Sequence, residues 1–218
     1  MSITPETVKQ KLASEDLGDR LRGVNEIRQL EPAVGFELVQ SAIKDKNARV
    51  RYSAVSQFDT LGGQDLEKSL NLLRGLLEDP EADVQAAAAD CLGGLKLVAA
   101  FEDLQQLYQS TSEWIVKLSV IAALGELGEP RGFEMLKQAL SEENDLVKTA
   151  AISSMGELGN TEAVSVLTPY ATNSDWQIRY RVAQALNRLG TPEAKAILEN
   201  LTNDQVEAVA EEAKKSRG

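Results

Sequence analysis

The sequence of 218 residues lacks histidine and contains one cysteine, Cys91. Without histidine, the chain has neither the most common general base and metal ligand nor any Ser-His or Cys-His nucleophile pair. A single cysteine excludes an internal disulfide and a cysteine-rich zinc site, and it suits a reducing compartment. We therefore expect no metal site and no resident cofactor. Any proton transfer would depend on carboxylates, tyrosines or the substrate.

Apolar spans and nucleotide motifs are missing as well. No apolar run approaches the length that crosses a bilayer, and residues 1–5 lack the basic and apolar regions of a secretory signal. Neither a P-loop nor a Gly-x-Gly-x-x-Gly sequence occurs. A net charge of −11 would repel phosphate backbones. We expect a cytoplasmic location, no membrane insertion and no nucleic-acid binding.

The most informative feature present is a repeat. Each copy has an aliphatic anchor, usually followed by a basic residue, then a small or β-branched residue three places on, and a Leu-Gly-type ending. Successive anchors are 34, 32, 31 and 31 residues apart, at Val50, Val84, Val116, Val147 and Ile178. A weaker copy 31 residues before the first one puts Arg20 in the basic slot. This period is typical of stacked helical hairpins.

Local patterns agree with helices. In the copy that starts at Val147, apolar residues recur three or four places apart, and no stretch alternates as a half-exposed strand does. Thr191-Pro192-Glu193 has the chemistry of a helix start. Glycines 62, 128, 159 and 190 are predicted to end helices in the left-handed conformation. The sequence predicts an all-α fold, an α-solenoid (superhelix) of about six helical hairpins. It is expected to form one domain over 1–218, with caps at 1–18 and 202–218 around repeats at 19–201.

The basic slot of each copy follows a polar residue about six positions earlier. Asp45 and Asp79 are two of these, and they can accept hydrogen bonds from turn amides and pair with basic side chains such as Arg51. We interpret this set as a structural ladder that joins the repeats, and not as catalytic residues.

Cys91 shares its slot with Gln57, Ala123, Ser154 and Ala185, which predicts a buried residue that lets helices approach closely. The alternative is a thiol that handles a thioether-linked ligand, which would need exposure and a lowered pKa.

Trp114 and Trp176 both lie two places before an anchor, where another copy has Asp145. A core position would not accept both types, so we expect partial exposure at a helix start. The two tryptophans are candidates for a contact surface. Packing onto the adjacent turn is the alternative.

Tyr52 and Tyr180 share another slot, and Asp90 and Arg188 fall on the same outward side of these helices. Such a stripe can bind a conjugated ligand by stacking and hydrogen bonding, or it can be a solvated helix face.

The copies Val50-Arg51-Tyr52-Ser53-Ala54-Val55 and Val84-Gln85-Ala86-Ala87-Ala88-Ala89 resemble HEAT repeats, in particular those of the phycobilin lyases. The resemblance covers about residues 16–201. The opening Ser2-Ile3-Thr4-Pro5-Glu6-Thr7-Val8 and the stretch from Asp83 to Lys96 further resemble the cyanobacterial phycobilisome degradation proteins of the NblB family.

This resemblance implies a factor that binds phycobiliproteins (phycocyanin, allophycocyanin) and promotes detachment of the thioether-linked bilin, phycocyanobilin. It also implies association with phycobilisomes at the cytoplasmic face of the thylakoid. A non-catalytic adaptor and a bilin-attaching lyase are the alternatives. In this family the second helix of each hairpin lines the concave face, which would put Tyr52, Asp90 and Tyr180 near a groove. No family catalytic motif can be carried over. The candidates are Asp90 and Cys91 for catalysis, and Tyr52, Trp114, Trp176, Tyr180 and Arg188 for binding a bilin or a partner.

Overall fold

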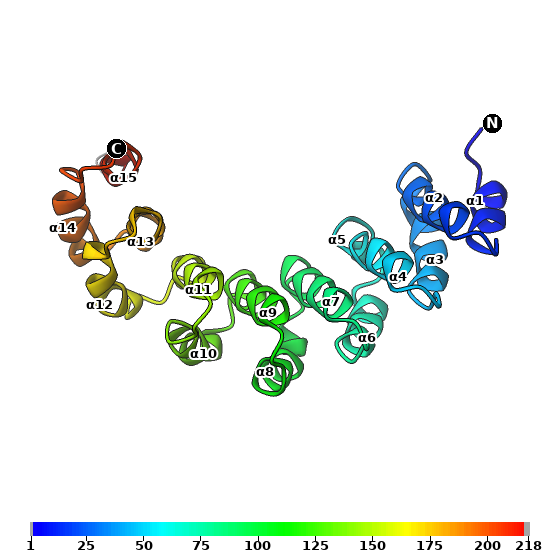
Figure 1. The fold of residues 1–218 in the computed structure, drawn as a ribbon, viewed down its shortest axis with the longest axis horizontal. Helices are drawn as coiled ribbons and strands as arrows, with labels where there is room; N and C mark the ends of the chain where they lie inside the picture. Colours follow the sequence, from blue (N-terminus) through cyan, green and yellow to red (C-terminus); the bar gives the residue numbers. More distant parts are fainter. Residues whose placement is uncertain (1, 216–218) are drawn as a thin grey trace. The chain divides into compact units, whose positions relative to one another are not determined.

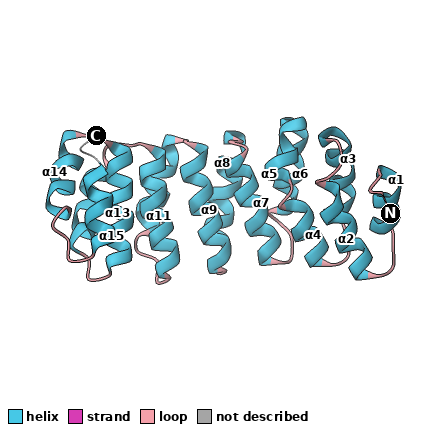
Figure 2. Ribbon diagram, turned by 90° about the horizontal axis from the view of Figure 1, so that it is seen from above, coloured by secondary structure: helices cyan, strands magenta, loops and turns pink. Residues whose placement is uncertain are grey.

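The structure, a computed structural model that describes residues 2–215, is helical with short turns and has no strand in that range (Figures 1 and 2). Its helices form two compact units, Met1–Ser119 and Val120–Gly218. The predicted all-α solenoid of helical hairpins is confirmed. The single domain with two caps stays a prediction.

Unit 1 consists of hairpins whose second helices pack side by side, since α2 contacts α4 and α4 contacts α7. The 3₁₀ turns η1 and η2 lie between hairpins. The helices and turns are α1 (Pro5–Leu12), α2 (Leu17–Ile27), α3 (Pro32–Ala42), α4 (Ala48–Val55), α5 (Phe58–Leu61), η1 (Gly62–Gln64), α6 (Leu66–Leu76), α7 (Ala82–Gly94), η2 (Val98–Ala100), α8 (Phe101–Ser110) and the start of α9 (Trp114–Leu127).

Unit 2 continues with the same plan, and its second helices α11, α13 and α15 contact one another in that order. After the end of α9, its elements are η3 (Pro130–Gly132), α10 (Phe133–Ala139), α11 (Asp145–Leu158), α12 (Ala163–Leu167), η4 (Thr168–Thr172), α13 (Trp176–Leu189), α14 (Pro192–Leu201) and α15 (Glu207–Lys214).

The repeat anchors form the core of both units. Val50, Val84, Val116 and Val147 are fully buried, and Ile178 is nearly so. Burying an aliphatic side chain of this size contributes about 1.5–3 kcal/mol. One anchor in every repeat therefore holds the second helices against their neighbours, as the spacing predicts.

Helix ends follow the sequence at most positions. Gly128, Gly159 and Gly190 have the predicted left-handed backbone, with φ of 67°, 73° and 64°. The prediction for Gly62 is wrong, because its φ is −63°. A Cβ at this position would lie 2.6 Å from Leu95 Cδ1, so a larger residue would require the Leu95 side chain to move.

The left-handed position after α7 is occupied by a lysine. Lys96 has φ 53°, and it follows Leu95 as the glycines of the other copies follow their leucines. The Leu97 N–H donates to the Leu92 carbonyl at 3.0 Å, which closes the helix end as a glycine would. Left-handed backbone is unfavourable for a residue with a Cβ, so this turn is strained.

Candidate functional site

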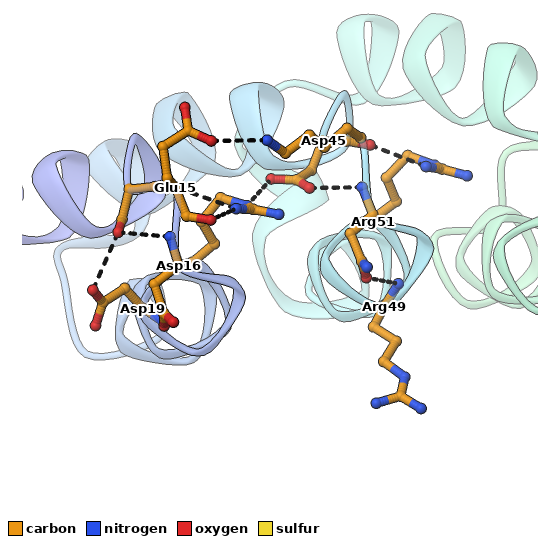
Figure 3. A network of polar contacts seen from close by, with 10 residues as sticks. Glu15, Asp16, Asp19, Asp45, Arg49 and Arg51 are labelled. Carbon is orange, nitrogen blue, oxygen red and sulfur yellow. Dashed lines mark hydrogen bonds and ion pairs between the residues drawn. The ribbon is translucent and has the colours of Figure 1, made fainter.

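The basic slots of unit 1 form the predicted ladder (Figure 3). Arg20 Nε donates to Asp45 Oδ2 at 2.8 Å, and Arg51 donates to both carboxylate oxygens of Asp79 at 2.7 and 2.8 Å. Arg51 Nη1 also donates to the Asp45 carbonyl at 3.0 Å, so each arginine joins the turn of its own repeat to the next turn. The turn amides complete the rung, since Asp79 Oδ1 accepts the Glu81 N–H at 3.0 Å. The structural interpretation of this slot is confirmed.

The next rung is built from neutral residues. Gln85 takes the arginine position, and its Nε2 donates to the Asp79 carbonyl at 2.8 Å. Thr111 takes the acid position and still caps its turn, because its Oγ1 accepts the Glu113 N–H at 3.1 Å. The Gln85 and Thr111 side chains therefore each bond to their own turn without an ion pair.

Unit 2 also contains a rung formed by an ion pair. Arg179 donates to both carboxylate oxygens of Asp204 at 2.7 and 2.9 Å, and its Nη1 donates to the Asn173 carbonyl at 2.7 Å. The hydrogen bond from Arg179 lowers the pKa of Asp204, although desolvation opposes this. Lys148 differs from the other basic slots, because it pairs with Asp145 of its own helix and leaves no rung of this kind.

A groove of about 1040 Å³ lies in unit 1, with walls from α2, α4, α7 and the first turns of α9. It brings together two residues that the sequence singled out. Tyr52, which is 48% exposed, comes from α4, and Asp90 comes from α7. Ser53 and Ala87, each three places after an anchor, line the wall between them.

The environment of Asp90 is unusual, because its carboxyl is partly desolvated although the residue is exposed to solvent. Desolvation by the groove wall raises the pKa of its carboxyl above 3.8, and a hydrogen bond with the Ser119 side chain opposes this only in part. Ser119 is buried and comes from α9. The pKa of this carboxyl is therefore shifted upward, in the direction that favours its protonated form. Sequence reasoning missed Ser119, since its slot looks like a packing position.

The rim of the groove carries both signs of charge. Lys46 pairs with Glu15 at 3.0 Å between two exposed side chains. The Arg49 side chain is exposed and has no ion pair with any residue from 2 to 215, and Figure 3 shows it pointing away from the ladder. Glu81 and Asp83 border the groove from the start of α7. The groove thus offers a cation, an aromatic ring and a carboxyl to a ligand.

Cys91 does not line this groove. Its side chain is 4% exposed, and its Sγ donates to the Val55 carbonyl at 3.2 Å. Gln57 in the equivalent slot donates to the Val24 carbonyl at 2.7 Å. The buried packing position predicted for this slot is confirmed.

Two of the binding candidates, Tyr180 and Arg188, belong to α13 of unit 2, and they contact side chains of the same unit. Gln184 Nε2 donates to the Tyr180 hydroxyl at 3.2 Å, while Arg188 pairs with Glu157 at 2.5 Å. The structure therefore groups Tyr52 with Asp90 and places these two apart, in the other unit.

Trp114 and Trp176 are the first residues of α9 and α13, and they are 45% and 43% exposed. Partial exposure at a helix start is confirmed for both. They belong to different units, and their role in contacting a partner stays a prediction. In the described part of the chain, no helix combines the length and apolar character that crossing a membrane requires.

Comparisons with known proteins concern the whole repeat array. The family model for HEAT repeats matches residues 36–125, 70–156 and 133–216. No curated protein matches the sequence. The fold is similar to that of the complex of CpcE and CpcF of phycocyanin lyase from Nostoc sp. PCC7120, with a TM-score of 0.67 and 23% identity over 100% of this chain and 88% of that one.

Other similar structures come from unrelated sources. Escherichia coli YibA gives a TM-score of 0.71 with 16% identity over 97% of this chain and 80% of its own. An archaeal HEAT-like repeats protein from Thermococcus onnurineus NA1 gives 0.63 with 12% identity over 99% and 96%. Identities this low show a shared fold. The matched repeats span most of the sequence, and the chain belongs to the HEAT-repeat family.

Proposed function

We propose that this protein binds phycobiliproteins and promotes detachment of their thioether-linked bilin, as the resemblance to the NblB family implies. We place it at the phycobilisome, on the cytoplasmic face of the thylakoid. The observation that carries the proposal is the groove of unit 1, which joins Tyr52, Arg49 and a carboxyl of raised pKa, Asp90, on one surface. The fold likeness to the CpcE–CpcF complex of phycocyanin lyase supports it.

A bilin has three features that these side chains can recognise. Its conjugated pyrrole rings can stack on the half-exposed ring of Tyr52. Its propionates can pair with Arg49, whose guanidinium is available at the rim. Its pyrrole N–H groups can donate to the exposed carboxyl of Asp90, which is hydrogen bonded to the Ser119 side chain. The groove volume, about 1040 Å³, lies at the upper end of the range for small-molecule sites.

Detachment can proceed as an elimination without an oxidant, a reductant or water. The C–S bond breaks with its electrons on sulfur, and the neighbouring bilin carbon loses a proton and forms a double bond to the carbon that carried sulfur. The sulfur then takes up a proton and leaves as the cysteine thiol of the phycobiliprotein. We assign Asp90 the role of proton donor or acceptor, because its carboxyl borders the groove with Tyr52 and its pKa is raised. Cys91 has no part in this scheme, since it is buried against Val55.

The test mixes the purified protein with phycocyanin and measures the bilin that stays covalently bound to the denatured subunits. We compare wild type with Asp90→Asn, and with Asp59→Asn as a matched control at an exposed acid outside the groove. Loss of general acid–base catalysis should slow detachment by at least about a hundredfold in Asp90→Asn only. Equal rates for the two variants would refute the assignment to Asp90. Unchanged pigment with wild type would refute detachment.

The second candidate is a non-catalytic adaptor that recruits phycobilisomes for disassembly. The exposed Trp114 and Trp176 favour it, because aromatic side chains at a surface commonly anchor interfaces. In that case Trp114→Ala and Trp176→Ala should weaken binding to phycocyanin or allophycocyanin, and the pigment should remain attached. A bilin-attaching lyase would instead load free phycocyanobilin onto the apo-subunit, and the same assay run in that direction detects it.

A further inference from the structure

A second cleft lies in unit 2, and the proposed function makes no use of it. It has a volume of about 720 Å³ and lies between the start of α13 and the turn that joins α14 to α15. Trp176 forms one wall, and the side chains of Asn200, Asn203 and Gln205 line the other. Of the predicted site residues, this cleft contains Trp176 alone.

The floor of the cleft is a completed rung of the ladder. Arg179 uses Nε and Nη2 on Asp204, and its Nη1 donates to the carbonyls of Asn173 and Ser174 at 2.7 and 3.2 Å. Asp204 Oδ1 additionally accepts the Val206 N–H at 2.8 Å. Because each group is occupied by its neighbours, the floor offers a ligand a rigid base and no free charge.

An equivalent cleft in unit 1 allows the effect of the tryptophan at position 176 to be compared. It lies at the equivalent place, between the start of α7 and the turn after α8, and its volume is about 360 Å³. Ala82 holds the position of the tryptophan there. The cleft at Trp176 is therefore twice as large and has a 43% exposed indole as its wall. Tryptophan is one of the residue types that most often anchor interfaces.

The opposite wall has amide groups that the protein does not use. Within residues 2–215, the side chains of Asn203 and Gln205 have no hydrogen-bond partner. A primary amide both donates and accepts, so it is complementary to a peptide group. An extended chain that passes the turn could pair its main chain with these amides.

The charge of the residues around the cleft determines which side chain of a bound segment would be favoured. The two stretches that border the cleft, 168–176 and 197–207, contain four acids and no basic residue. The acids are Asp175, Glu199, Asp204 and Glu207; Arg179 forms an ion pair with Asp204 and also has a favourable charge interaction with Asp175. The electrostatic field around Trp176 therefore favours a cation, and an indole face is the best aromatic partner for one.

We propose that this cleft binds an extended basic segment of a partner protein, with an arginine or lysine side chain stacked on Trp176 and its main chain on Asn203 and Gln205. This site is separate from the groove of unit 1 and does not rest on bilin chemistry. Stacking of a partly desolvated cation on the ring is expected to account for about five- to thirtyfold in affinity.

The probe is a random octapeptide phage library, selected on the full chain and depleted on Trp176→Ala. Synthetic peptides from the enriched clones are then titrated by fluorescence polarisation. We expect them to contain arginine or lysine, to bind less tightly in higher salt, and to lose about five- to thirtyfold in affinity to Trp176→Ala. Leu146→Ala, which shortens another exposed apolar side chain of unit 2 outside the cleft, should bind them as wild type does.

Gln205→Ala provides a second variant that leaves Trp176 intact, and it should weaken the same peptides. Thermal unfolding of each variant checks that the fold is retained. The proposal fails if no peptide discriminates between wild type and Trp176→Ala, if the enriched peptides lack basic residues, or if Leu146→Ala weakens them equally. Bilin detachment does not enter the readout, so either proposal can fail without the other.

Discussion

The rung between Arg51 and Asp79 provides a quantitative test of the ladder. Their side chains are 13% and 6% exposed and share two hydrogen bonds. Asp79→Thr removes the charge but keeps a hydroxyl for the Glu81 N–H, as Thr111 does in the next rung. The variant leaves Arg51 mostly buried without its carboxylate. Removing one partner of a buried pair costs about 3–5 kcal/mol, and we expect about 3 kcal/mol because Arg51 keeps its bond to the Asp45 carbonyl.

The effect of Arg51→Gln on the free energy of unfolding should change sign when Asp79 has already been replaced by threonine. In the wild-type background, Arg51→Gln leaves the Asp79 carboxylate without its ion-pair partner and should destabilise the protein. In the Asp79→Thr background it removes the unpaired cation and gives the neutral residue types that Gln85 and Thr111 have at these positions, so it should restore at least about 1 kcal/mol. Urea unfolding measures both effects in a Trp176→Phe background, where fluorescence from Trp114 reports on unit 1. If Arg51→Gln destabilises both backgrounds equally, the rung does not act as a coupled pair.

Acidification supplies an independent check on the same rung. Desolvation tends to raise the pKa of Asp79, but hydrogen bonds from Arg51 and the Glu81 N–H, with the charge of Arg51, outweigh it and hold the pKa below 3.8. A carboxyl with a lowered folded pKa contributes stability above its unfolded value, and the contribution is lost as the pH falls through the folded value. The stability difference between wild type and Asp79→Thr should therefore shrink below pH 3.8. A constant difference across that window would contradict the reasoning.

Three further predictions concern single positions. Lys96→Gly relieves a left-handed backbone and should raise the free energy of unfolding by up to about 1 kcal/mol in urea titrations, whereas Gly159→Ala should lower it by a similar amount. Cys91 should react with a thiol reagent only as fast as the protein opens, and Cys91→Ala should leave bilin detachment unchanged; rapid labelling of the native protein would refute its burial. Because the pKa of Asp90 is raised, its ionisation destabilises the fold as the pH rises above 3.8. Asp90→Asn should therefore be more stable than wild type at neutral pH and lose that advantage in acid, as urea titrations across pH would show.

The sequence predicted the features that the repeat imposes on every copy. Anchors such as Val84 are buried because a hairpin cannot cover its apolar face alone. The ladder was predictable because its partners recur at a fixed offset, so that Arg51 reaches Asp79 as Arg20 reaches Asp45. Burial of Cys91 followed from the small residues that share its slot.

Features that depend on contacts between different repeats were harder to predict. Gly62 has the place of a left-handed glycine, yet its backbone is helical and its small size makes room for Leu95. The raised pKa of Asp90 depends on the wall around it and on Ser119, which is 29 residues away in the sequence. A single sequence does not show which small residue in the packing slot also hydrogen bonds to an acid.

The position of a residue within the repeat and the type of residue at that position therefore carry different information in this chain. The slot two places before the anchor is occupied by Ala48, Ala82 and Trp176 in three copies, and the structure puts all three at helix starts that border hollows in the surface. The repeat determines where the residue two places before the anchor lies, because the ladder residues hold the preceding turn in place. The side chain in this slot differs between the hollows, which have volumes of about 360 Å³ beside Ala82 and about 720 Å³ beside Trp176. Function in such a scaffold follows from departures from the repeat, and those departures are the positions to mutate first.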